Sequence, residues 1–329
     1  MTKYLVNATD LTAMASIIRA KGDTSAGLSW PNGFINGIQN IEGGHDTEDG
    51  IIQRTISGAY TNSRVTLITR YAFYYCSNLT AVSFPSCTEI GSYAFYSCIN
   101  LTAISFPSCT SIAGYAFCNC SNLTAASFPS CTAIGISAFY NCYRLTAVSF
   151  PSCTTISSLA FYNCSNLTAI SFPSCTAIGI SAFHNCSNLT TANFSSCATI
   201  GTNAFSDCIN LTVVSFPSCT AIDGSAFYNC SNLTAVSFPV CATISSYAFR
   251  RCYRLLSAYF LGTSVPELQH SNAFLSTPIA GYTSSTGGVL GSIFVRASLL
   301  TSFQSATNWA YFSERFVSLT DEEIAALNT

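Results

Sequence analysis

A mainly β repeat solenoid of parallel strands is the fold that the sequence predicts, and three observations point to it. An Ala-Phe dipeptide recurs every 22 residues without insertion, from Phe73 to Phe249. Each unit opens with apolar residues that alternate with small ones, which is typical of a strand buried on one face. A 22-residue unit cannot close a hydrophobic core alone, so neighbouring units must stack.

The first complete unit, residues 79–100, shows how strand and turn divide. Its inward positions are at offsets 0, 3, 5, 8 and 11, namely Leu79, Val82, Phe84, Cys87 and Ile90. Side chains of an extended segment alternate, so Val82 and Phe84 point to one face and Ala81 and Ser83 to the other. Pro85 then ends the strand, because proline cannot donate to the ladder. This spacing is the signature L-x-x-L-x-L-x-x-N/C of a leucine-rich repeat.

The second half of the unit predicts a turn on the convex side of the solenoid. Ala94, Phe95 and Cys98 have the i, i+1, i+4 spacing of one helical or 3₁₀ turn, which is too short for a regular helix. Eight full repeats of this kind fill residues 79–254. The predicted fold is therefore a parallel leucine-rich repeat sheet with short 3₁₀ or helical turns.

The repeat resembles that of the BspA-like family, which is known from bacterial surface proteins. The residues that carry the resemblance are the strand at 101–107 (LTAISFP), Ile112, and the AFxxC turn of Ala116, Phe117 and Cys120. It extends over residues 55–319. The resemblance implies a solenoid used for adhesion or partner recognition, with no catalytic residues to carry over.

Residues 1–41 predict a small α-helical attachment module. Leu11, Met14, Ile17 and Ile18 form an apolar stripe, and residues 42–50 follow as an acidic, glycine-containing linker. Residues 11–41 also resemble an N-terminal segment of prophage tail-associated proteins. That resemblance implies display on a phage tail, with residues 1–41 contacting an assembly partner.

Both ends of the repeat array are expected to be caps, because stacked repeats need atypical end units. Residues 51–78 read as an N-terminal capping repeat, in which Val65 replaces the usual Cys. Residues 255–329 read as degenerate repeats and a C-terminal cap. Within it we expect strands at 292–295 and 315–319, a short helix at 297–305 and an aromatic plug at 309–312.

Composition excludes several classes of protein. Charged residues make up 8% of the 329, and the net charge is −2, so no basic footprint for nucleic acid exists. No apolar run reaches the roughly 18 to 20 residues of a membrane span. No secretory signal is visible in the first residues, so we expect a cytoplasmic chain before assembly.

An enzyme is not expected from this inventory of side chains. General acid–base catalysis needs a histidine or a tuned carboxylate near the substrate. His45, His184 and His270 are scattered, and the only acids of the complete repeats are Glu89, Asp207 and Asp223, at different offsets. The sequence predicts no catalytic residues, no cofactor and no metal.

Seventeen of the eighteen cysteines form two ladders, and Cys118 is outside both. Neighbouring ladder positions would be one strand spacing apart, which is wider than a disulfide prefers. The short ligand loops of zinc sites are missing as well. We therefore expect reduced, buried thiols.

Binding is expected where aromatic residues and arginines stand outside the core, since these dominate interaction hot spots. The candidate partner-binding residues are Tyr96, Tyr140, Tyr143, Arg144, Tyr162, Tyr228, Tyr253, Arg254 and Tyr259. The sequence thus predicts a non-enzymatic adhesion protein for a protein or glycan ligand at a cell or virion surface. The alternative is a rigid spacer of a tail or surface assembly, docked through the N-terminal helices.

Overall fold

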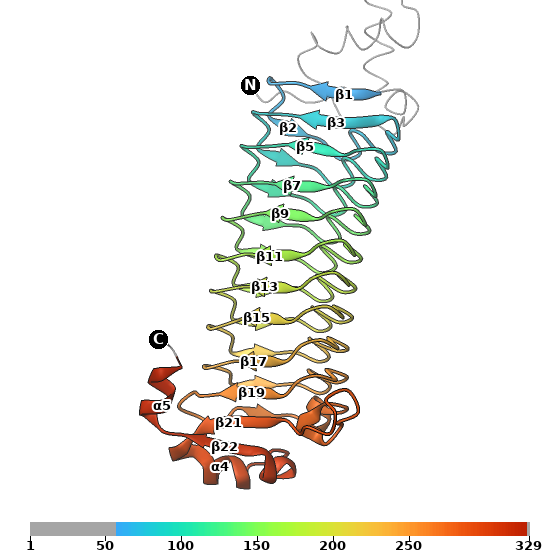
Figure 1. Cartoon of the computed structure of the whole chain (residues 1–329). Coiled ribbons are helices and arrows are strands. Elements are labelled where there is room, and N and C mark those ends of the chain that lie inside the picture. The colour runs from blue at the N-terminus through green and yellow to red at the C-terminus, as the bar shows by residue number, and fades with distance from the viewer. Residues whose placement is uncertain (1–56, 328–329) are drawn as a thin grey trace, which may run out of the picture. The chain divides into compact units, whose positions relative to one another are not determined.

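The computed structural model describes residues 57–327. The predicted helical module at 1–41, the linker at 42–50 and residues 51–56 of the capping repeat lie outside the described residues. The chain divides into two units, the first ending at Phe150 and the second beginning at Pro151. In each unit, successive 22-residue turns of chain stack in register as a parallel β-solenoid (Figure 1).

The first unit has two series of parallel strands, one at each strand position of the repeat. The order is β1-β3-β5 with β7-β9 in one series, and β2-β4-β6-β8 in the other. The strands are β1 (Gly58–Thr61), β2 (Leu67–Ile68), β3 (Leu79–Ser83), β4 (Glu89–Ile90), β5 (Ala103–Ser105), β6 (Ser111–Ile112), β7 (Ala125–Ser127), β8 (Ala133–Ile134) and β9 (Ala147–Ser149).

The second unit also has two series of parallel strands, followed by further elements at its C-terminal end. Its repeat strands are β10 (Thr155–Ile156), β11 (Ala169–Ser171), β12 (Ala177–Ile178), β13 (Thr191–Asn193), β14 (Thr199–Ile200), β15 (Val213–Ser215), β16 (Ala221–Ile222), β17 (Ala235–Ser237), β18 (Thr243–Ile244), β19 (Ser257–Phe260) and β20 (Glu267–Leu268). The cap contains η1 (Ser271–Phe274), η2 (Pro278–Ala280), β21 (Ser292–Arg296), η3 (Ala297–Leu299), α4 (Leu300–Ser305), η4 (Ala310–Arg315), β22 (Phe316–Leu319) and α5 (Asp321–Ala326).

The stacking of equivalent side chains, on which the predicted fold depends, is confirmed in both units. In the first unit the rings of Phe117 and Phe139 are 5.2 Å apart and 10° from parallel. In the second, Phe161 and Phe183 are 5.2 Å apart and 3° from parallel. These phenylalanines are completely buried. A one-residue slip would turn a strand's apolar side chains outward, so this buried face fixes the register.

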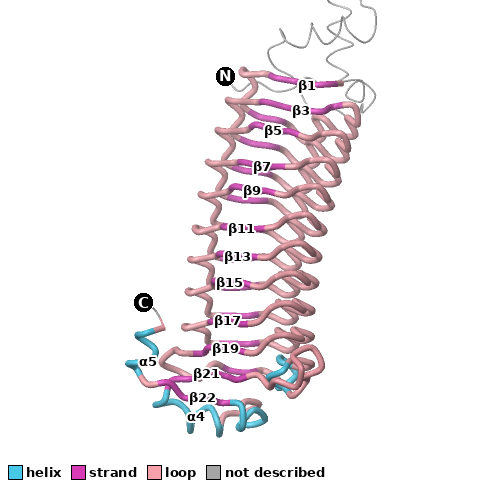
Figure 2. Tube along the Cα trace, viewed as in Figure 1, coloured by secondary structure: helices cyan, strands magenta, loops and turns pink. Residues whose placement is uncertain are grey.

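Each repeat contains a second strand that the sequence did not predict. Glu89–Ile90 pairs with Ser111–Ile112, and the same pairing recurs down both units. The sequence pattern showed only a single buried isoleucine here. A strand of two residues is too short to give a recognisable alternation of apolar and polar residues. Most of each repeat is loop between these two short strands (Figure 2).

The predicted 3₁₀ or helical turn of the repeats is a pair of left-handed residues within consecutive turns. Tyr93 and Ser97 have φ values of 59° and 56°. Backbone N–H groups donate three residues back, as from Cys98 to Phe95 (3.2 Å). Others donate to the next repeat, as from Phe95 to Ala116 (2.7 Å). Left-handed residues cannot continue a right-handed helix, so the segment becomes a third hydrogen-bonded column.

The two cysteine ladders are free, buried thiols, as the spacing predicts. All eighteen cysteines of the chain lie within the described residues and are buried. In one ladder the thiol donates to the preceding repeat, as from Cys98 Sγ to the Phe73 carbonyl (3.0 Å). In the other it donates two residues ahead, as from Cys87 Sγ to the Glu89 carbonyl (3.2 Å). These ladder cysteines thus fill small core positions and donate to backbone carbonyls.

Two further strands and an aromatic cluster follow the last repeat, in the region where the sequence predicts a cap. The strand Ser292–Arg296 pairs with Ser257–Phe260, and the last strand, Phe316–Leu319, pairs with Ser292–Arg296. In the aromatic plug, Trp309 is fully buried and its indole N–H donates to the Pro266 carbonyl (2.7 Å). These residues shield the last repeat's phenylalanine column.

Candidate binding surface

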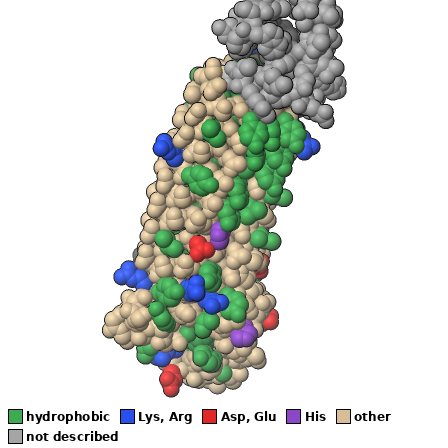
Figure 3. All heavy atoms as spheres, turned by 90° about the vertical axis from the view of Figure 1, so that its right-hand side faces the viewer, with side chains coloured by type: hydrophobic (Ala, Val, Ile, Leu, Met, Phe, Trp, Pro, Cys, Tyr) green, Lys and Arg blue, Asp and Glu red, His purple; other side chains and the backbone are tan. Residues whose placement is uncertain are grey.

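Six tyrosines form one continuous surface on the turn side of the first unit, which we call the tyrosine surface. Its members are Tyr71, Tyr74, Tyr75, Tyr93, Tyr96 and Tyr115. Figure 3 looks onto the turn side and shows hydrophobic side chains gathered over these repeats. The turn backbone separates this surface from the buried core. The same turn segment therefore contributes side chains to the core and to the tyrosine surface.

The tyrosine side chains stack because the repeats stack. Tyr93 and Tyr115 are 4.7 Å apart and 4° from parallel, and Tyr74 and Tyr96 are 5.2 Å apart and 23° from parallel. Tyr75 meets the Tyr96 ring edge-on at 5.6 Å. Stacked neighbours within a column therefore cover each other's facing sides.

The backbone of the turn does not favour tyrosine at these positions. Tyr71, Tyr75, Tyr93 and Tyr115 have φ values of 59° to 61°, the left-handed region that suits glycine and asparagine. Most later repeats hold serine or asparagine at the equivalent places, for example Ser137 and Asn203, and bulky residues such as Leu159 and Tyr247 are fewer there. Bulky residues in this region cost on the order of 1 kcal/mol or more each. Local conformation therefore does not explain the tyrosines.

The surface is electrically neutral apart from one arginine. The guanidinium of Arg70 lies 4.6 Å from the centre of the Tyr71 ring and donates to the Tyr71 hydroxyl (2.8 Å). Burial and a hydrogen bond to Tyr75 raise the pKa of Tyr74 to about 12. Burial also raises the pKa values of Tyr93 and Tyr96. These hydroxyls stay protonated at neutral pH and can both donate and accept.

The nine residues predicted from the sequence do not form one site. In the first unit, Tyr96 belongs to the tyrosine surface, and Tyr140 is half-buried at the same position of a later repeat. Tyr143 and Arg144 are exposed just before the Ala147–Ser149 strand. They belong to a different part of the repeat from the turn tyrosines.

In the second unit the remaining five predicted residues are also spread over several parts of the repeat. Tyr162 stacks on His184 at 4.7 Å. Tyr228 lies under two arginine side chains, and Tyr253 contacts Tyr282 at 5.1 Å. Arg254 donates to Asn232 Oδ1 (3.4 Å). Tyr259 stacks on Phe294 at 4.4 Å, on the strand face of the cap.

Sequence reasoning missed five of the six residues of the tyrosine surface. It considered the position after the Ala-Phe dipeptide, and only from residue 79 onward. A signal was present directly before that dipeptide, where Tyr71, Tyr93 and Tyr115 recur at the 22-residue spacing. Whether that position faces solvent depends on the left-handed turn, which the residue pattern does not reveal.

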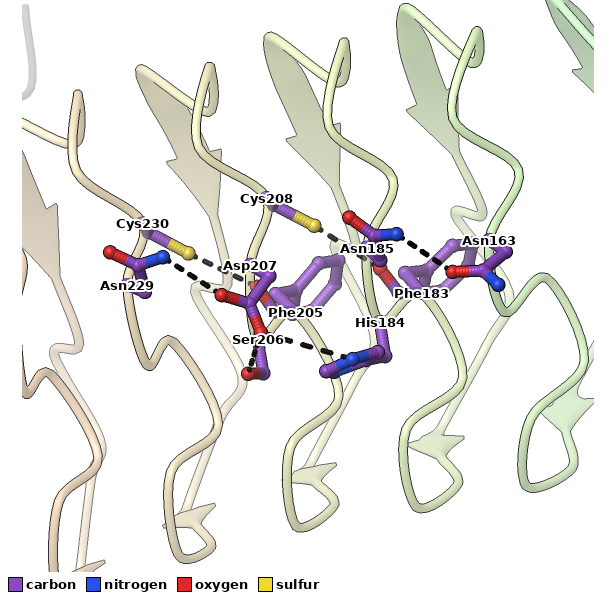
Figure 4. A network of polar contacts seen from close by, with 10 residues as sticks. All are labelled: Asn163, Phe183, His184, Asn185, Phe205, Ser206, Asp207, Cys208, Asn229 and Cys230. Carbon is purple, nitrogen blue, oxygen red and sulfur yellow. Dashed lines mark hydrogen bonds and ion pairs between the residues drawn. The ribbon is translucent and has the colours of Figure 1, made fainter. Parts of the chain in front are cut away.

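A polar network around Asp207 is the closest approach to a catalytic arrangement (Figure 4). Asp207 accepts hydrogen bonds from Ser206 (3.1 Å) and Asn229 (2.8 Å), and its carboxylate is 3.8 Å from His184 Nε2. Ser206 thus donates to the carboxylate and not to the imidazole, which differs from the serine–histidine–aspartate order of a catalytic triad. Burial lowers the pKa of His184, and the Asp207 charge opposes that effect.

This network is part of a structural ladder. Asparagines at the same position bond between repeats, as from Asn185 Nδ2 to Asn163 Oδ1 (2.8 Å), and Asp207 takes the place of one of them. Within residues 57–327, no group of three or more His, Cys, Asp or Glu side chains could hold a metal ion. No helix in that range has both the length and the apolar composition to cross a membrane.

Comparison with known proteins agrees with the repeat architecture. The family model "BspA type Leucine rich repeat region (6 copies)" matches residues 55–168 and 154–278. No curated protein sequence matches the chain.

Similar solved structures include a leucine-rich repeat protein from Bacteroides ovatus, with 19% identity and a TM-score of 0.36, covering 80% of this chain and 92% of that one. A leucine rich cell surface protein from Faecalibacterium prausnitzii has 22% identity and a TM-score of 0.35, covering 78% and 82%. The leucine-rich repeat protein of T. pallidum has 24% identity and a TM-score of 0.39, covering 54% and 77%. Since the family model extends over more than half of the sequence, the chain belongs to the BspA-type leucine-rich repeat family.

Proposed function

We propose that the chain is a non-enzymatic recognition protein that binds a partner at a cell or virion surface through the tyrosine surface. The observation that carries this proposal is a set of six contacting tyrosines, four of which occupy left-handed positions that favour other residues. They are only partly buried, so they do not serve the core either. Strained residues without a structural purpose mark functional positions.

The chemistry of the surface favours a protein over a glycan as its partner. Sugar rings pack on exposed aromatic faces, and here the faces of Tyr93 and Tyr115 cover each other at 4.7 Å. Stacking therefore leaves less of these ring faces open to a sugar. Tyrosine supplies large, amphipathic contact area at low entropy cost, which is why it is enriched in protein interfaces.

The proposal is tested by replacing three tyrosines with the residue that later repeats use. Ser137, Ser181 and Ser225 occupy the position of Tyr71, Tyr93 and Tyr115, so the triple serine variant should fold. Both proteins are applied to arrays of surface proteins and of glycans. We expect protein signals that fall about tenfold or more in the variant, as for hot-spot residues.

A matched control is Tyr311→Ser, because Tyr311 is 73% exposed and belongs to the C-terminal cap. Its signals should equal those of the unchanged protein. Protein signals that survive the triple replacement would contradict the proposed surface. Binding to glycans alone would contradict the proposed partner class.

The spacer function is the second candidate, and the repeated ladders support it. Backbone, threonine and asparagine hydrogen bonds join neighbouring repeats in each unit, as from Thr102 Oγ1 to the Thr80 carbonyl (3.0 Å). Such ladders give rigidity without any ligand. Deleting residues 1–45 separates the functions: loss of assembly with retained binding supports recognition, whereas a truncated chain that binds nothing on the arrays favours the spacer.

A further inference from the structure

Two arginines converge on one tyrosine ring in the second unit, on the turn side. The guanidinium carbons of Arg250 and Arg251 lie 5.8 Å and 5.5 Å from the centre of the Tyr228 ring. Arg250 also lies 5.0 Å from the centre of the Tyr247 ring. We call these four residues the arginine–tyrosine cluster. Figure 3 shows blue side chains grouped on this face between hydrophobic ones.

Neither arginine forms an ion pair with an acid of the described residues. The two ion pairs found between residues 57 and 327 join His184 to Asp207 and Arg296 to Asp321. The Nε atom of Arg250 is buried, and no atom of the described chain accepts its hydrogen. Two like charges held beside one ring, one of them partly desolvated, raise the local positive potential.

The backbone conformation at Arg251 is unfavourable for an arginine, and the contacts of its side chain do not offset that strain. Its φ is 63°, at a position where Asn163, Asn185 and Asn229 occur in other repeats. Asparagine tolerates this left-handed conformation and can extend the side-chain ladder between repeats. An arginine there forgoes both advantages.

We propose that the arginine–tyrosine cluster binds an acidic peptide segment of a partner protein. Guanidinium groups bind carboxylates in planar, bidentate geometry, and a site made of arginines without lysines suits that recognition. Apolar side chains flank the charges: Leu275 is 43% exposed and its carbonyl accepts from the Arg251 N–H (3.0 Å), and Tyr247 is 38% exposed. This combination fits a segment in which glutamates alternate with apolar residues.

A glycan is the less fitting ligand for this cluster. Two guanidinium groups already lie beside the Tyr228 ring, so less of the ring is open to a sugar. The site also differs from the tyrosine surface, which has neutral hydroxyls and lies in the other unit. The inference therefore goes beyond the proposed function, and either can fail without the other.

The test uses the full chain and a fluorescent nonapeptide of alternating glutamate and leucine, with a glutamine version as the neutral control. Fluorescence anisotropy should show binding of the acidic peptide that weakens as salt rises and at least about tenfold weaker binding of the neutral one. A sulfated oligosaccharide and a sialylated trisaccharide are the alternative ligands. The proposal is overturned if either saccharide binds and the acidic peptide does not, or if both peptides bind equally.

Arg251→Asn separates binding from folding. It installs the residue that other repeats use, so the midpoint of thermal unfolding should stay the same or rise. Peptide affinity should nevertheless fall about tenfold, the loss expected for a charge-assisted contact. Arg64→Gln, which removes an exposed arginine of the first unit, should leave affinity within about twofold. Unchanged affinity in the Arg251 variant would overturn the assignment.

Discussion

Raising the pH from about 7.5 to about 9.5 should destabilise this protein strongly, because its thiols are buried. Burial raises the pKa of Cys87 to about 11 and that of Cys118 to about 12, from an ordinary value of 9.0. Fifteen of the thiols are shifted upward in this way. In the unfolded chain the same thiols ionise near their ordinary pKa.

The sign follows from proton counting. Above pH 9 the unfolded chain binds fewer protons than the folded one, so the free energy of unfolding falls as pH rises. The thiol contribution is fully present below that pH and is lost as pH approaches the folded pKa values. At about pH 9.5 each protonated thiol accounts for about 0.8 kcal/mol, or about 1.7 kcal/mol for a repeat with two. For fifteen thiols the loss is about 13 kcal/mol, as large as the stability of a typical domain.

The assay is urea unfolding followed by circular dichroism at several pH values, with a reductant present. A matched variant is Cys197→Val, since Val65 fills the same position in the first repeat and is buried there. It should lose about 0.8 kcal/mol less than the unchanged protein over this pH range. In parallel, Ellman's reagent should react with few thiols of the native protein and with all eighteen of the unfolded chain. A pH-independent free energy of unfolding, or rapid reaction of the native thiols, would refute the reasoning.

Three further predictions concern individual side chains. Phe183→Ala should lower the free energy of unfolding by about 3 to 5 kcal/mol through a cavity between Phe161 and Phe205, while exposed Ser171→Ala should change it by less than about 0.5 kcal/mol in the same urea titration. Burial lowers the pKa of His184 from 6.5, so this side chain binds fewer protons in the folded state than in the unfolded state. Stability should therefore fall as the pH drops through 6.5. Differential scanning calorimetry should show a weaker dependence of the thermal midpoint on pH after His184→Tyr. Asp207→Asn restores the asparagine ladder and should leave the thermal midpoint equal or higher, and a decrease would show that the carboxylate stabilises the fold.

The architecture of the repeats was predictable because it depends on residues that recur at one spacing. The 22-residue period, the inward Val82 and Phe84 and the cap residues Trp309 and Phe312 have their expected places. Identical units must bury identical faces, so the period alone fixes which side chains stack. The second strand at Glu89–Ile90 was not predicted, because a strand of two residues shows no periodicity in the sequence.

The candidate surface was only partly predictable for a different reason. Tyr96 was singled out, but Tyr93 and Tyr115 were not, although Tyr93 lies in the same turn as Tyr96 and Tyr115 stacks on Tyr93. Their exposure depends on two left-handed residues in each repeat. Serine, asparagine, tyrosine, leucine and arginine all occupy these places, so residue type does not reveal the backbone there.

The sequence by itself determined the period, the buried columns and the cysteine ladders, since burial of apolar side chains at constant spacing has one stacked solution. The tertiary structure decided which exposed residues become neighbours. It joined six tyrosines into one surface, put Arg250 and Arg251 over one ring, and used Asp207 as a member of a ladder. Those contacts depend on turn geometry and on how closely one repeat approaches the next. Neither can be predicted from the residues of a single repeat.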